Sequence, residues 1–220
     1  MYNLVVNKKQ TLGDDVVRYK KMFRQCISAA DAIAMRNTLS ELKKEDCEVV
    51  NNGSEIRSLS FDIKTDPKTR DGEYKIQYIA GDMSTLRLYK LIRQHDECLT
   101  VSMPVSEKQC RRILSGDTEW MADSRVQLFR IFYADLKKHN AKPKKVTAYK
   151  NYLYTFENGK CAVSLKSGIC GSFDCKCFLE SDPSMVTLFG NTVAEIKWND
   201  ELPEYMYNIM QTVSVCAANQ

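Results

Sequence analysis

Apolar and polar residues alternate in three consecutive segments of the first half of the chain. These segments are residues 55–62 (EIRSLSFD), 73–82 (EYKIQYIAGD) and 84–93 (STLRLYKLIR). Successive side chains of a β-strand point to opposite faces, so the alternation predicts three strands that each bury one face. The short polar break at Gly81 and Asp82 is typical of a turn that joins antiparallel neighbours.

Other segments have the apolar spacing of helices or further strands. Helices are predicted over residues 29–44, 106–114, 124–139 and 203–216. Ser28 and Ser106 are predicted N-caps, because a serine hydroxyl accepts a hydrogen bond from the first helical turn. Strands are predicted between residues 47 and 101 with a turn at residues 51–53, over 145–155 and 161–167, and around Glu195. Without a repeat or a linker, this pattern favours one β-rich α+β domain over residues 1–220.

Basic residues lie among the apolar ones in the first three strands, at Arg57, Lys75 and Arg87. If the strands close into a barrel, alternation allows all three side chains to point into one lumen. Fixed cations in a lumen would suit a polyanion such as a phosphate chain. The pattern alone favours the simpler interpretation of amphipathic strands whose charged side chains are solvated.

Six segments resemble those of the VTC domain in their amino-acid sequence and in their order. The VTC domain is the polyphosphate-polymerase branch of the triphosphate tunnel metalloenzymes. IRSLSFD resembles the family's IRSLYFD, and KIQYIAGDMSTLRLYK resembles its RIRYYNGD hairpin followed by IRLEKK. SAADAIAMRNTL resembles the first helix of the family, and ILSGDTEWM, KPKKVTAYKNYLY and VAEIKWNDELPEYM resemble later segments in the same order. The resemblance covers residues 18–213 and implies an antiparallel β-barrel, the triphosphate tunnel fold, with flanking helices.

The resemblance also implies a ligand and a set of residues that bind it. A VTC-like tunnel binds polyphosphate or a nucleoside triphosphate, and carboxylates hold Mg²⁺ or Mn²⁺. The phosphate-binding positions that match are Arg57, Lys75, Arg87 and Lys197, with Arg24 and Lys166 as further candidates. Glu195 matches the metal-binding glutamate, although one carboxylate holds such an ion weakly unless substrate phosphates complete its coordination. A salt bridge from Glu195 to Lys197 or Arg57 is the alternative.

Several positions depart from the family where its chemistry takes place. Uncharged residues stand at positions where the family has charged ones, namely Gln77, Tyr89, Leu91, Thr100, Asn151 and Ala162. Lys90 is basic but falls on the opposite strand face. Each lost charge-assisted hydrogen bond removes about 1.5–3 kcal/mol of binding. We therefore expect reduced or absent polymerase activity. A working metal-dependent polymerase and a structural or partner-binding module remain alternatives.

Composition places limits on partners and location. The formal net charge of +4 over 220 residues does not favour a general nucleic-acid surface, so a positive focus must be local. No apolar stretch has the length of a membrane span, which argues against direct membrane insertion. Nine scattered cysteines without a secretory signal favour a reduced, cytoplasmic protein. The spacing of Cys170, Cys175 and Cys177 is not a standard zinc pattern, so reduced thiols are expected there.

Overall fold

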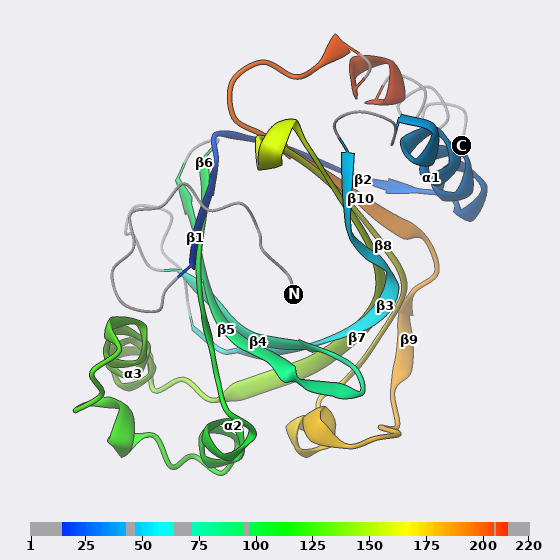
Figure 1. Ribbon diagram of the computed structural model, residues 1–220. Helices are drawn as coiled ribbons and strands as arrows, with labels where there is room; N and C mark the ends of the chain where they lie inside the picture. Colours follow the sequence, from blue (N-terminus) through cyan, green and yellow to red (C-terminus); the bar gives the residue numbers. More distant parts are fainter. Residues whose placement is uncertain (1–14, 43–46, 64–71, 95–96, 205, 211–220) are drawn as a thin grey trace.

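The computed structural model of the chain describes residues 15–42, 47–63, 72–94, 97–204 and 206–210. Its strands are β1 (Asp15–Tyr19), β2 (Lys21–Ile27), β3 (Cys47–Phe61), β4 (Glu73–Ile79), β5 (Asp82–Gln94), β6 (Glu97–Pro104), β7 (Pro143–Phe156), β8 (Cys161–Ser172), β9 (Val186–Phe189) and β10 (Thr192–Trp198). They form one antiparallel sheet in the order β1-β6-β5-β4-β3-β7-β8-β10-β2, with β9 beside β8. The sheet curls into a nearly closed barrel, seen almost end-on in Figure 1. The predicted α+β barrel is confirmed.

The barrel closes through one stretch of chain that changes partners. β1 pairs with β6 at one end of the sheet, and β2 pairs with β10 at the other end. Only Lys20 lies between β1 and β2, and its backbone N–H donates to the carbonyl of Trp198 at 3.1 Å. The two outermost strands of the sheet are therefore consecutive in the chain and draw the sheet into a ring.

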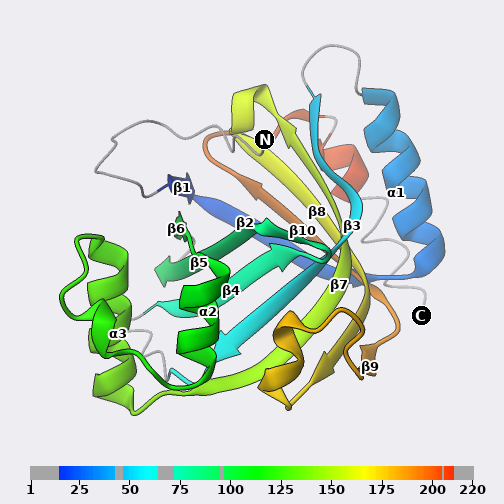
Figure 2. The ribbon, with the colours of Figure 1, turned by 60° about the horizontal axis from the view of Figure 1, so that its bottom comes forward.

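Helices cover the outside of this ring on two sides, as Figures 1 and 2 show. Over β3–β6 lie α2 (Glu107–Leu114), α3 (Gln127–His139) and the short 3-10 helices η2 (Glu119–Met121) and η4 (Cys175–Leu179). Over β7, β8, β10 and β2 lie α1 (Ala29–Glu41) and helical residues 206–210. The first outer core includes Leu59, Ile76, Leu88, Phe132 and Phe178, and the second includes Leu39, Val163, Leu165, Ile196 and Met206.

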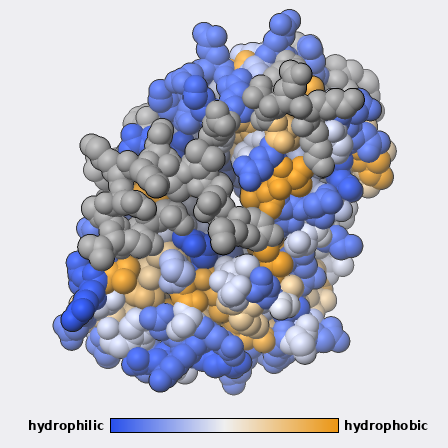
Figure 3. Space-filling view, viewed as in Figure 1, coloured by the Kyte–Doolittle hydropathy of each residue, from blue (hydrophilic) through white to orange (hydrophobic). Residues whose placement is uncertain are grey.

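The helices begin where local sequence predicts. Ser28 accepts a hydrogen bond from the backbone N–H of Asp31 at 3.1 Å, and Ser106 forms a capping box with Gln109. α1 ends at Glu41, earlier than predicted, and α3 begins at residue 127 because the preceding residue is extended. The helices present hydrophilic residues to solvent, which gather around the periphery of the face in Figure 3.

The predicted turn at residues 51–53 does not end a strand. β3 continues through it with two register shifts against β7 between residues 49 and 54. The side chain of Asn51 accepts a hydrogen bond from the N–H of Ser54 at 2.9 Å. Gly53 has φ +86°, and a Cβ there would lie 2.7 Å from the ring of Tyr152. The Asn-Asn-Gly sequence therefore forms a bulge, for which glycine is required.

Two predicted helix ends fall outside the described residues, namely residues 43–44 and the part of the C-terminal helix beyond residue 210. The extent of a single domain over residues 1–220 stays a prediction. Among the described helices, none combines the length and the apolar character that crossing a bilayer requires.

Candidate functional site

The polar residues that alternate with the outer cores point into the barrel. On β4 the apolar side chains belong to the first outer core, so Lys75 and Gln77 point inward. Gln77 lies opposite Ser58 of β3. Its side-chain amide donates to the hydroxyl of Ser58 at 3.1 Å and to that of Tyr149 on β7 at 3.2 Å. These bonds fix one interior wall across three strands.

Glu195 is the centre of an interior charge cluster on the adjacent wall. On β10 it lies opposite Arg24 of β2 and Ser164 of β8. The Nζ atom of Lys197 lies 2.8 Å from Glu195 Oε1, and the Nζ atom of Lys166 lies 3.6 Å from the same oxygen. The Glu195 side chain is only 8% exposed. The predicted salt bridge to Lys197 is therefore present, and a second lysine shares it.

Positive charge exceeds negative charge around this carboxylate. Burial raises the pKa of Glu195, but the stronger combined effect of its cationic neighbours, chiefly Lys166 and Lys197, holds it at about 2. Burial lowers the pKa of Lys166 to about 8, an effect that Glu195 opposes. That value includes smaller lowering effects of the positive charges of Lys197, Lys75 and Arg24. Lys166, Lys197 and Arg24 surround this one carboxylate, so cations are in local excess, although the lowered pKa of Lys166 comes mainly from its burial.

Arg87 extends the basic surface along β5. It lies opposite Gln77, and its guanidinium donates to the hydroxyl of Ser102 on β6 at 3.2 Å. Lys75 pairs with Glu73 at 3.0 Å and keeps 26% of its side-chain surface exposed. The side chains of Lys166 and Lys197 keep 23% and 21%. Each of these three lysine side chains is therefore partly open to solvent.

Arg57 is the predicted site residue that the structure places elsewhere. It shares the outer face of β3 with buried Leu59, and no register shift separates the two residues. Its guanidinium donates to the hydroxyl of Tyr78 at 3.3 Å and to the carbonyls of Glu180 and Ser181, just after η4. The prediction that Arg57 points into the lumen is wrong. Alternation fixes it outside, where it anchors the segment after η4.

The residues around Glu195 do not suit a resident divalent cation. Mg²⁺ and Mn²⁺ prefer several oxygen ligands, whereas this carboxylate already contacts two ammonium groups. In the described part of the chain, no three His, Cys, Asp or Glu side chains are grouped so that they could hold a metal. The Mg²⁺ or Mn²⁺ expected from the resemblance stays a prediction that depends on oxygens from a ligand.

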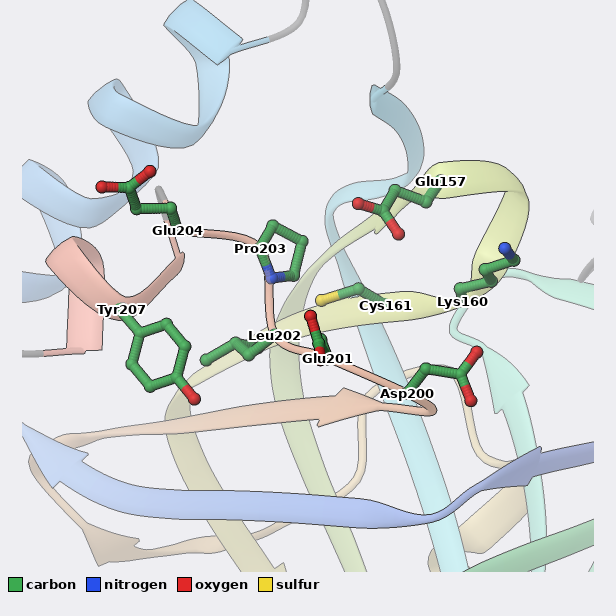
Figure 4. Close-up of a pocket in the computed structure, with 9 residues that line it drawn as sticks. All are labelled: Glu157, Lys160, Cys161, Asp200, Glu201, Leu202, Pro203, Glu204 and Tyr207. Atoms are coloured by element: carbon green, nitrogen blue, oxygen red, sulfur yellow. The ribbon is translucent and has the colours of Figure 1, made fainter.

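A separate pocket of about 700 Å³ lies where β8 begins and β10 has ended (Figure 4). Its charged lining residues are Glu157, Lys160, Asp200, Glu201 and Glu204. Acidic side chains outnumber basic ones there, so the pocket repels a polyanion. The basic interior of the barrel is the candidate site for a phosphate chain.

The sequence matches no protein-family model and no curated protein. Its structure is similar to a candidate adenylate cyclase from Bacillus halodurans, with 10% identity, a TM-score of 0.50, and coverage of 93% of this chain and 92% of that chain. The chain has a triphosphate tunnel fold.

Two further similar structures have lower TM-scores. One is a candidate adenylyl cyclase from Hippeastrum with a dominant triphosphatase activity, at 9% identity, TM-score 0.45, and coverage of 87% and 84% of the two chains. The other is a chain of the Schizosaccharomyces pombe Mediator head module, at 8% identity, TM-score 0.46, and coverage of 92% and 96%. At such identities the likeness concerns the fold alone.

The neutral polar residues of the interior were not among the predicted site residues. Gln77, Ser58 and Tyr149 form one hydrogen-bonded group, and the Nζ atom of Lys166 lies 5.9 Å from the centre of the Tyr149 ring. A sequence signal did exist for Tyr149, because alternation separates it from Tyr154, which is buried in the second outer core.

Proposed function

We propose that the barrel interior binds a phosphate chain, either inorganic polyphosphate or the triphosphate of a nucleotide, in the manner of a divergent VTC domain. The binding residues are Arg24, Lys75, Arg87, Lys166 and Lys197. The observation that carries this proposal is the group of cations around Glu195: Lys166 and Lys197 contact its carboxylate, and Arg24 lies opposite it on β2. Phosphate oxygens would relieve the repulsion among these cations and accept their hydrogen bonds.

The same interior supports little or no polymerase activity. Phosphoryl transfer needs charge stabilisation on the moving phosphoryl group and alignment of the attacking and leaving oxygens. The interior has neutral side chains at Gln77 and Tyr89, and its carboxylate Glu195 is held by lysines. Loss of charged contacts to the transferred phosphoryl group lowers kcat, whereas binding of the rest of the phosphate chain is retained.

The proposal is tested by thermal unfolding in tripolyphosphate, long-chain polyphosphate and ATP. A ligand at a hundred times its Kd stabilises by about 2.7 kcal/mol, which is a readily measured shift. The double variant Lys75→Gln with Lys166→Gln should lose the shift. A matched control is Lys137→Gln with Lys144→Gln, because both of these lysines form exposed ion pairs outside the barrel. No stabilisation by any phosphate compound would contradict the proposal and favour a structural or partner-binding module.

One observation favours an active polymerase as a second candidate. Glu195 and Lys197, which match functional positions of the resembling family, lie in contact in the interior. An active enzyme would transfer the γ-phosphoryl group of ATP to a growing polyphosphate chain. Its signature is ATP consumption with chain growth that Glu195→Gln abolishes. Binding without turnover in the wild type would exclude this candidate.

A further inference from the structure

Lysine ammonium groups surround the carboxylate where a divalent cation is expected. Lys166 and Lys197 both contact Oε1 of Glu195, at 3.6 Å and 2.8 Å. Arg24 lies directly across from Glu195 on β2. The positive charges of Lys75 and Arg24 contribute to the lowered pKa of Lys166. The carboxylate thus has cationic side chains from β2, β8 and β10 around it.

Such surroundings disfavour a metal ion on simple electrostatic grounds. A divalent cation bound to Glu195 would lie within a few ångströms of two ammonium groups and would repel both. To bind, it would have to displace Lys197 from its contact, and the carboxylate would supply only one of the several oxygens that the ion needs. A phosphate chain meets no such conflict, because its oxygens accept hydrogen bonds from the same ammonium groups.

We propose that the interior binds its phosphate chain in the metal-free form, with Lys166 and Lys197 in the place of the cation. This inference rests on the proposed function and names its substrate class, a free polyanion such as inorganic polyphosphate. In the unliganded barrel Glu195 serves as an internal counter-ion. When the phosphate chain binds, its oxygens replace Glu195 as the hydrogen-bond acceptors of the two ammonium groups. Mg²⁺ then acts as an inhibitor of binding, because it neutralises part of the ligand charge in solution.

The test is calorimetric titration of the full chain with tripolyphosphate, first in EDTA and then in excess Mg²⁺ or Mn²⁺. We expect binding in EDTA, and affinity about tenfold weaker in Mg²⁺, the equivalent of one charge-assisted hydrogen bond. Binding that requires the metal would overturn this inference and leave the proposed function standing. No binding in either condition would overturn both.

A charge-removing variant gives an independent readout of opposite sign for the two cases. Glu195→Gln removes the carboxylate that competes with phosphate for the lysines. We expect it to tighten tripolyphosphate binding about tenfold in EDTA. If Glu195 held a metal, the same variant would weaken binding in Mg²⁺. Glu107→Gln is the control, because Glu107 forms an exposed ion pair with Arg111 on α2.

Discussion

Glu195→Gln should destabilise the unliganded protein, even though it tightens phosphate binding. The cluster lowers the pKa of Glu195 from 4.5 to about 2. Each pKa unit corresponds to about 1.36 kcal/mol, so the ionised carboxylate contributes roughly 3 kcal/mol of stability at pH 7. Glutamine has the shape of the neutral acid without the charge. The variant should therefore lose a similar free energy of unfolding.

Urea denaturation of the wild type and the variant measures this loss, with Glu107→Gln as the exposed control. The pKa of Glu195 is lower in the folded state than in the unfolded state, so its contribution is complete above pH 4.5 and is lost as pH falls toward 2. The difference between the wild type and Glu195→Gln should shrink over that interval. Saturating tripolyphosphate at pH 7 should reduce the difference as well, because the ligand supplies the missing negative charge.

Two results would refute this reasoning. A loss at pH 7 no larger than that of Glu107→Gln would mean that the carboxylate does not balance the interior cations. A difference that stays constant between pH 5 and pH 2 would mean that the loss comes from packing and not from charge.

Three further predictions concern residues around the barrel. Arg57→Gln should lower the free energy of unfolding by ~2–4 kcal/mol through lost buried hydrogen bonds, yet leave tripolyphosphate affinity within twofold; a tenfold loss in calorimetry would contradict its place outside the barrel. Lys90→Met should destabilise by ~3 kcal/mol in urea because it leaves Asp135, 3.1 Å from Lys90 Nζ, without its ion pair; an unchanged midpoint would argue against that pair. Affinity for tripolyphosphate should fall as pH rises through 8, where Lys166 loses its proton, and Lys166→Gln should remove this dependence; equal slopes for both proteins would contradict it.

Local features of the fold were predictable because they depend on neighbouring residues. Ser28 and Ser106 cap helices through bonds to residues three positions away. Alternation also placed Lys90 on the face opposite Arg87, and Lys90 indeed packs against α3 through Asp135. The alternation along strands and the capping residues therefore predicted most of the secondary structure.

The choice of inner and outer face was less predictable, because both faces of β3 carry polar residues. Alternation places Arg57 on the same face as Leu59 and Ser58 on the other face, but local sequence does not show which face lines the lumen. The outer position of Arg57 depends on residues just after η4. Its guanidinium donates hydrogen bonds to the carbonyls of Glu180 and Ser181, more than 120 positions away in the sequence. The contact of Gln77 with Tyr149 was not predicted for the same reason, because these two residues are also far apart in the sequence.

The proposed function requires that a phosphate chain binds inside the barrel. A crystal structure of the protein with tripolyphosphate in EDTA tests it most directly. We predict phosphate oxygens within hydrogen-bond distance of Lys75, Lys166 and Lys197, with the Nζ atoms of the latter two moved away from Glu195. Tripolyphosphate bound only on the outer surface, or an interior in which Lys166 and Lys197 keep their contacts with Glu195, would contradict it.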